Sequence, residues 1–175
     1  MAYDFTVDPF TQVYKSLWAI LEANSTFASL VKPGNRIKYD GTSENPEKFE
    51  AMYADMNEVE IYPMGREDEV VSSAHYHITK VYEIRISTPS TRLDTKLHPL
   101  AWKIMQIFKE AADGGFSAKA TAAGITYDMG YVKGCRLRNY VPAKDDPELI
   151  RGVNKWTARL QVAVEMSIHR EQLTA

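Results

Sequence analysis

The chain has 175 residues and a mass of 19.9 kDa, and its 45% hydrophobic and 25% charged residues exclude a disordered or fibrous protein. Its net charge of −2 gives no reason to expect nucleic acid or an anionic membrane as a partner. The single cysteine, Cys135, cannot form an internal disulfide, and no stretch reaches the ~20 apolar residues of a membrane-spanning helix. We therefore expect one domain over residues 1–175.

The N-terminal third predicts a helix followed by short strands. Asp8 and Pro9 form a helix start signal, and apolar residues recur at helical spacing until Pro33, which predicts a helix over residues 9–30. We expect a short strand over 37–39 and a short helix over 47–53. A strand over 58–62, with Val59 and Ile61 on one face, then leads into a polar loop over 63–73.

The middle of the chain predicts a strand and then the strongest helix. In the strand over 75–87, Ile78, Tyr82, Ile84 and Ile86 share one face, with Lys80 as the exception. Leucine, isoleucine and alanine residues follow a 3–4 spacing over 91–113, which predicts a helix that ends at Gly114 and Gly115. The small residues of 117–124 predict a mobile loop.

The C-terminal part predicts two more strands. Alternating apolar residues from Ile125 to Leu137 indicate a strand that bends at Gly130 or Gly134, and a long loop over 139–154 follows. Every second residue from Trp156 to Ile168 is apolar, which predicts a strand about 43 Å long. The fold class expected is α+β: a mostly antiparallel or mixed central sheet, two amphipathic helices packed on it, and a long C-terminal strand.

Few residues suggest chemistry. The sequence has no glycine-rich phosphate loop and no nucleophile elbow, and it predicts no cofactor. His75 and His77 would point from the same face of a strand, so they could bind a metal if His98, His169 or a carboxylate supplied a third ligand. We interpret them as the solvated start of a strand, and a small metal-binding α+β enzyme remains the alternative. Cys135 is interpreted as a buried apolar residue.

Charge is distributed unevenly along the chain. Acidic residues crowd residues 44–69, against only Lys48 and Arg66, whereas basic residues predominate over 131–170. One interpretation is a solvated surface. The other is a dipolar subunit whose acidic part contacts the basic part of a neighbour, an arrangement that closes into rings. The candidate interface residues are Glu67, Asp68, Glu69, Arg136, Arg138, Asp145, Asp146 and Arg159.

The order of elements resembles the tail terminator, or tail completion, proteins of long-tailed bacteriophages. Four features carry the resemblance: the first helix with its ending at residues 30–37, the segment 46–63, the strand 81–88 followed at once by the helix through 100–104, and the final strand 156–168. Relative to a compact member of that family, this chain adds an acidic insert at about 40–57 and the loop at about 139–154, which would provide extra contacts with neighbours.

The resemblance implies a fold with helices on a central sheet and a structural role in the virion without catalytic residues. It implies a homo-oligomer, a hexameric ring on the head-proximal end of the tail tube that is assembled in the host cytoplasm. The ring would stop polymerisation of the tube protein and present the docking surface for the head–tail connector. Genomic DNA would pass through its lumen without specific binding, and no membrane is involved.

The resemblance also suggests where contacts lie. Glu67, Asp68 and Glu69 are candidates for a lumen or rim loop, because an acidic surface does not retain DNA phosphates. The loops at 117–124 and around Asp145 and Asp146 are candidates for contact with the tube or the connector. The competing interpretations are a head–tail connector, a head-completion or other neck protein, and an unrelated α+β interaction module.

Overall fold

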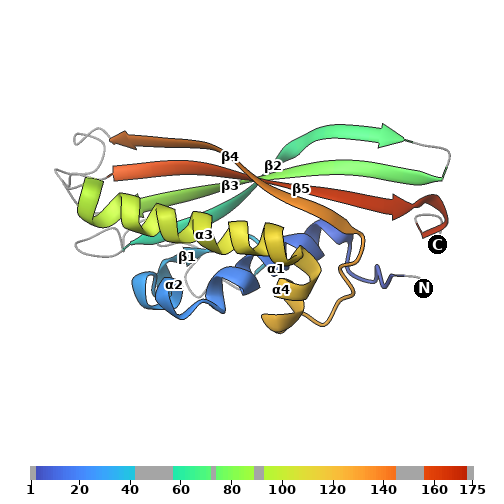
Figure 1. Ribbon diagram of the computed structural model, residues 1–175, viewed down its shortest axis with the longest axis horizontal. Helices are drawn as coiled ribbons and strands as arrows, with labels where there is room; N and C mark the ends of the chain where they lie inside the picture. Colours follow the sequence, from blue (N-terminus) through green and yellow to red (C-terminus); the bar gives the residue numbers. More distant parts are fainter. Residues whose placement is uncertain (1–2, 42–56, 72–73, 89–92, 145–155, 173–175) are drawn as a thin grey trace.

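The computed structural model describes residues 3–41, 57–71, 74–88, 93–144 and 156–172. Figure 1 shows them as a twisted five-stranded sheet with the helices gathered on one of its sides. We call the side that the helices cover the helix face and the opposite side the outer face. This is the α+β architecture with a mostly antiparallel sheet that the sequence predicts.

The sheet is built from two long hairpins that meet at its centre. Its strands are β1 (Arg36–Ile37), β2 (Glu58–Val71), β3 (His75–Thr88), β4 (Val132–Lys144) and β5 (Trp156–His169), in the order β1-β2-β3-β5-β4. Among the described strands, β1 and β2 pair in parallel and the other three pairs are antiparallel. The central strands β3 and β5 pair along their whole length, from His75 opposite His169 to Thr88 opposite Trp156. The long C-terminal strand is therefore confirmed.

The core lies between the helix face and the helices. Register places Tyr82 opposite Val162 and Ile84 opposite Leu160, and all four side chains are buried. The apolar residues that alternate along β3 and β5 in the sequence therefore face the helices, and most of the residues between them lie on the outer face. Arg85, Arg159 and other polar residues occupy the outer face, as expected for a sheet with helices on one side.

The predicted N-terminal helix forms as two helices. Asp8 caps α1 (Pro9–Glu22) by accepting from the Thr11 N–H at 2.9 Å, which confirms the predicted start. Asn24 then interrupts the helix, and its side chain accepts from Phe27 N–H at 3.1 Å as the cap of α2 (Ser25–Leu30). The prediction of one helix over 9–30 was wrong because an asparagine cap competes with a continuous helical hydrogen-bond ladder.

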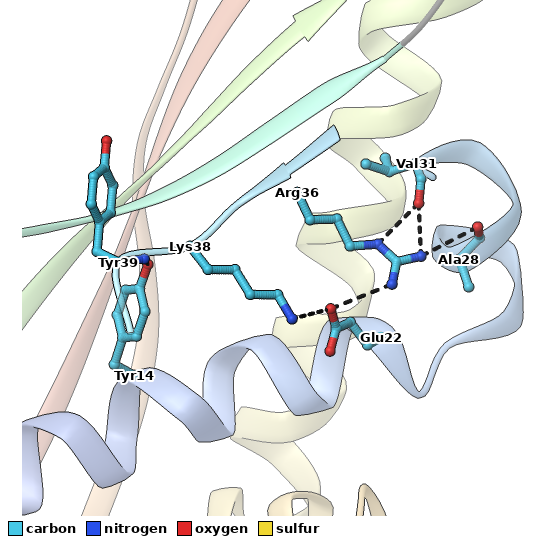
Figure 2. A network of polar contacts seen from close by, with 7 residues as sticks. All are labelled: Tyr14, Glu22, Ala28, Val31, Arg36, Lys38 and Tyr39. Atoms are coloured by element: carbon cyan, nitrogen blue, oxygen red, sulfur yellow. Dashed lines mark hydrogen bonds and ion pairs between the residues drawn. The ribbon is translucent and has the colours of Figure 1, made fainter. Parts of the chain in front are cut away.

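Arg36 fixes α2 against the start of the sheet, as Figure 2 shows. After the 3-10 turn Pro33–Asn35, its guanidinium donates to the Val31 carbonyl at 2.8 and 3.0 Å and to the Ala28 carbonyl at 3.5 Å, the orphan acceptors at the end of α2. Arg36 and Lys38 both reach the Glu22 carboxylate, at 3.3 and 2.5 Å. The short strand β1 is therefore fastened to both N-terminal helices.

The strongest predicted helix is confirmed, with a different start. A π-helical turn (Leu93–Leu97) precedes α3 (His98–Gly114), and Pro99 lies in its first turn, where a missing N–H costs little. Gly115 takes a φ of 85°, a left-handed conformation that suits glycine at a helix end.

Three predicted loops are wrong in whole or in part. Residues 63–71 continue β2, with register shifts near Arg66, because pairing with β3 outweighs the weak local pattern. The alanine-rich segment 117–124 lies largely in α4 (Phe116–Ala122), whose Phe116 and Ala120 are buried. The loop over 139–154 begins later, because β4 runs on to Lys144.

The strand predicted from Ile125 begins only at Val132, and a register shift between Val132 and Gly134 matches the expected bend. The predicted short helix at 47–53, most of the acidic insert, and the loop residues Asp145 and Asp146 lie outside the described residues. The chain ends in a 3-10 turn (Arg170–Gln172) after β5.

Candidate functional site

Two strands with opposite charge lie toward opposite flanks of the sheet. The β2 strand carries Glu58, Glu60, Glu67, Asp68 and Glu69 against Arg66, whereas β4 carries Lys133, Arg136, Arg138 and Lys144 and no acidic residue. The strand order puts β4 at one edge and β2 next to the other, where β1 pairs only with Val59 and Glu60. The uneven charge of the sequence therefore becomes a charge separation across the fold.

At the acidic flank, the first residues of β2 take part in a compact ionic group on the outer face. Arg85 on β3 donates to Glu83 at 2.6 Å, contacts Glu60 at 3.5 Å, and lies 4.4 Å from the centre of the Tyr62 ring. The Tyr39 hydroxyl donates to Glu60. Partial burial and the Glu60 carboxylate raise the pKa of Tyr39 to about 12. These contacts join Tyr39, which follows β1, to Glu60 of β2 and through it to Arg85 of β3.

At the basic flank, the outer face carries three arginines from the candidate interface. Register places Arg136 opposite Ala163, Arg138 opposite Gln161, and Arg159 opposite Val141, so all three lie on the outer face near β4. Arg136 contacts the Glu165 carboxylate, and both side chains are substantially exposed, so the pair adds little stability. The structure thus brings together the basic members of the candidate set.

The acidic members of that set are placed differently from the prediction. Glu67, Asp68 and Glu69 belong to β2 and not to a loop, with Asp68 opposite Thr79 and Glu69 opposite Ile78. They lie in the C-terminal half of β2. Figure 1 shows that this half of the strand extends past α1 and α4. Asp145 and Asp146 fall outside the described residues, so their role stays a prediction.

A pocket of about 220 Å³ opens beside α1 on the β1–β2 side of the fold. Its wall comprises Phe10, Thr11, Tyr14, Tyr39, Asp40, Pro63, Lys80 and Tyr82. The residue that breaks the apolar pattern of β3, Lys80, lines this pocket and donates to the Met64 carbonyl at 2.5 Å. In the sequence, Lys80 stands at a position of β3 where the alternation predicts an apolar residue, and this exception could have indicated the pocket.

The histidine pair of β3 gains a third member but no metal geometry. The rings of His75 and His77 lie 6.0 Å apart, and that of His169 lies 4.9 Å from that of His75, because β3 and β5 pair there. In the described part of the chain, no group of three or more histidine, cysteine or acidic side chains is arranged to hold a metal ion. His98 begins α3 and packs near Tyr140, away from this group.

Cys135 is buried on β4, and burial raises the pKa of its thiol to about 12. A thiol held in its neutral form is a poor nucleophile, which agrees with its interpretation as an apolar core residue. Among the helices of the described residues, none combines the length and the apolar run needed to cross a membrane.

Comparison with known proteins finds a likeness of fold. No protein-family model matches the sequence, and a search of curated proteins finds no match. Among solved structures, the fold is similar to that of a chain in the virion of a native gene transfer agent particle, with a TM-score of 0.58 and 10% sequence identity. The likeness covers 94% of this chain and 99% of that chain. The two chains therefore share one fold over almost their entire lengths.

Proposed function

We propose that this chain is a structural protein of a phage-like virion that acts as a tail terminator. In this role, copies of the chain form a hexameric ring on the head-proximal end of the tail tube. The ring stops addition of further tube protein and offers the surface on which the head–tail connector docks. Genomic DNA crosses its lumen without specific binding.

The observation that carries this proposal is the fold likeness over nearly the whole of both chains. The matched chain is part of a virion, and a match that leaves almost no residue of either chain unpaired argues for one shared domain rather than a shared motif. Fold alone does not fix function, so the specific role comes from the resemblance of the sequence to tail terminators. The same domain would span residues 1–175, with the insert near 40–57 as an addition.

The charge separation across the fold supports ring formation. A ring needs two different, complementary surfaces on each copy, because each subunit contacts its neighbours through opposite flanks. The acidic β2 and the basic β4 lie toward opposite flanks of the sheet, which is the arrangement that head-to-tail association requires. In such a ring Glu67, Asp68 and Glu69 can serve at a subunit contact or face the DNA channel.

The experiment is negative-stain electron microscopy with mass analysis of the purified chain, alone and with purified tail tube protein. The proposal predicts rings with a central hole, either free or at one end of each tube. A stable dimer would contradict it, because a two-fold pair uses up the complementary surface that a ring needs. A head–tail connector would instead bind the head-side partner and leave the tube ends bare.

A further inference from the structure

The sheet has two edges along which, in the described part of the chain, most backbone positions face no partner strand. At one end of the strand order lies β4. At the other end, β1 pairs with only Val59 and Glu60 of the 14-residue β2. A long edge strand presents backbone N–H and C=O groups to which a further strand can bind, and proteins normally cover or interrupt such an edge. These two edges are therefore candidate contact surfaces.

The hydrogen-bond pattern identifies which groups of β4 face its open edge. The N–H of Ser167 in β5 donates to the Tyr131 carbonyl at 2.8 Å. Every second residue of β5 counted from Ser167 therefore faces β4, because neighbouring residues of a strand form hydrogen bonds to opposite sides. Cys135 and Leu137 pair with the residues of β5 that face β3 instead, so their N–H and C=O groups point toward the open edge. Pro142, which has no N–H, occupies the same kind of position, as expected for proline in an edge strand.

The same reasoning identifies the open positions of β2. The Ile61 carbonyl points away from β3, since it accepts a hydrogen bond from the Tyr14 hydroxyl of α1. The residues of β3 opposite Ile61 and Glu69 are an even number of positions apart, so the N–H and C=O of Glu69 also face the open edge. The stretch Asp68–Val71 pairs with β3 in regular register. It lies beyond the part of β2 that β1 covers, so it is open to a further strand.

The open stretches of β2 and β4 lie at the same level of the sheet and differ in charge. The cross-strand register runs in one row from Asp68 of β2, across β3 and β5, to Gly134 of β4. The charged residues on either side of this row are Glu67, Asp68 and Glu69 on β2, and Lys133 and Arg136 on β4. An acidic edge and a basic edge therefore face opposite ways at one level of the fold.

We propose that the β4 edge of one copy of this chain pairs with the β2 edge of the next copy, so that their sheets join into one continuous sheet around the ring. The inference rests on the ring of the proposed function and names the contact between its subunits. The charge complementarity of the two edges argues for a second copy as the partner, with one edge of each copy meeting the other edge of its neighbour.

Strand direction fits this contact. Three antiparallel pairs separate β2 from β4, so the two strands run in opposite directions within one copy. A rotation about an axis that runs along the strands keeps these directions. The β4 strand of one copy therefore meets the β2 strand of the next as an antiparallel pair, which is the more stable kind of ladder.

Charge also selects the register of the contact. Residues whose backbone groups face the open edges pair with each other, so Cys135 aligns with either Glu69 or Val71 of the next copy. Alignment with Glu69 places Arg136 opposite Asp68, whereas the alternative places Arg136 opposite an apolar residue. Opposite charges directly across a ladder stabilise it, which favours the first register.

The first test links this pair of positions covalently. Arg136 and Asp68 would form a non-hydrogen-bonded pair, whose Cα atoms lie about 4.5 Å apart, within the range of a disulfide. The variant with Arg136→Cys and Asp68→Cys is oxidised with diamide, alone and with purified tail tube protein, and is separated on a non-reducing denaturing gel. The controls are each single variant and the pair Lys109→Cys and Asp68→Cys, since Lys109 is exposed on α3. The buried Cys135 is unchanged in every variant.

We expect the double variant to give a ladder of linked chains that ends at the size of the closed ring. An equimolar mixture of the two single variants should stop at covalent dimers, because each chain then carries one reactive edge. Each single variant alone and the Lys109→Cys control should remain unlinked.

The second test addresses the backbone contact. Glu69→Pro removes the N–H that faces the open edge, whereas Glu69→Gln removes the same charge and keeps the N–H. Analytical ultracentrifugation compares their self-association, with circular dichroism as the check on folding. Glu69→Pro should associate about tenfold more weakly than Glu69→Gln.

The proposal is overturned if the double variant gives no linked chains under either condition, or if folded Glu69→Pro associates as tightly as Glu69→Gln. It is also overturned if Arg136→Cys alone links to itself, since that would indicate a two-fold pair of β4 strands. Rings that cap tubes without forming the links would exclude this contact while the terminator function stands. Linked rings that leave the tube ends bare would support the contact and contradict the terminator function.

Discussion

The hydroxyl group of Tyr14 in α1 donates a 2.7 Å hydrogen bond to the backbone carbonyl of Ile61 in β2. The same oxygen accepts the N–H of Tyr39 at 3.0 Å, so one side chain joins the first helix, the second strand and the segment after β1. Residues of these three elements, together with Lys80 and Tyr82 of β3, form the wall of the pocket. A change at Tyr14 therefore tests how much these hydrogen bonds contribute to the stability of the fold.

Tyr14→Phe should lower the free energy of unfolding by about 1–3 kcal/mol, because it keeps the ring and leaves a buried carbonyl without its donor. Urea unfolding measured by circular dichroism gives this value. Tyr62→Phe is the control: Tyr62 is 40% exposed, so its change should stay within about 0.5 kcal/mol. Equal effects of the two changes would argue that the hydrogen bond between the Tyr14 hydroxyl and the Ile61 carbonyl does not stabilise the fold.

Arg36→Ala should also lower the free energy of unfolding by about 1–3 kcal/mol. The side chain of Arg36 is 9% exposed, and its loss leaves the carbonyls at the end of α2 without donors (Figure 2). Arg36→Lys should recover only part of the loss, since an ammonium group cannot make the forked contact. Lys109→Ala removes an exposed ion pair and should cost about 0.5 kcal/mol or less.

Stability should fall at alkaline pH. Burial raises the pKa of Tyr82 and of Tyr131 above the ordinary value of 10.0, so these phenols keep their protons in the folded chain. The unfolded chain releases them above pH 10.0, so the unfolded state then binds fewer protons and the free energy of unfolding decreases as pH rises. Below that pH their contribution is fully present.

Urea unfolding at pH 8 and pH 11 would measure the alkaline loss, and Tyr82→Phe should make the loss smaller. The comparison uses the change with pH rather than the absolute stability, because this variant also loses the bond to the Phe10 carbonyl. An unchanged pH dependence in Tyr82→Phe would exclude this tyrosine as a cause.

Reversing charge on one strand should weaken self-association, and reversing both should restore it. Two variants test this: one carries Arg136→Glu and Arg138→Glu, and the other carries Glu67→Lys, Asp68→Lys and Glu69→Lys. At low salt, each variant should self-associate at least about tenfold more weakly than the wild-type chain. The chain that carries both sets should recover. Lys119→Glu on α4, whose side chain pairs with Glu110, is the control for a charge change outside both strands.

Ultracentrifugation at two salt concentrations would measure this, because screening should reduce the difference between the variants. If none of these charge reversals changes self-association, the charged residues of β2 and β4 belong to solvated surfaces and not to an interface.

Long periodic segments of the sequence predicted their structure well. Alternation from Trp156 to Ile168 predicted β5 and its buried face, and the 3–4 spacing around Leu100 and Ile104 predicted α3. Segments whose structure depends on distant partners were wrong: residues 63–71 form strand because β3 lies beside them. Asn139 resembled the start of a loop, yet its φ of 50° accommodates an irregularity in β4, and the strand continues.

The candidate site was predictable in its charges and not in its contacts. The acidic and basic segments could be read directly, but only the strand order shows that β2 and β4 lie toward opposite flanks. The approach of His169 to His75 depends on the register of β3 and β5, which local patterns do not encode. Lys80 broke the apolar pattern of β3, and this exception was the available signal for the pocket beside α1.

The most direct test of the terminator function is the length of tail tubes in cells that produce the particle without this chain, measured by electron microscopy. The account predicts tubes that grow beyond their normal length and remain without heads, and restoration of normal length when the chain is supplied. Tubes of normal length that fail to join heads would contradict the terminator role in favour of a connector, and complete particles would contradict both.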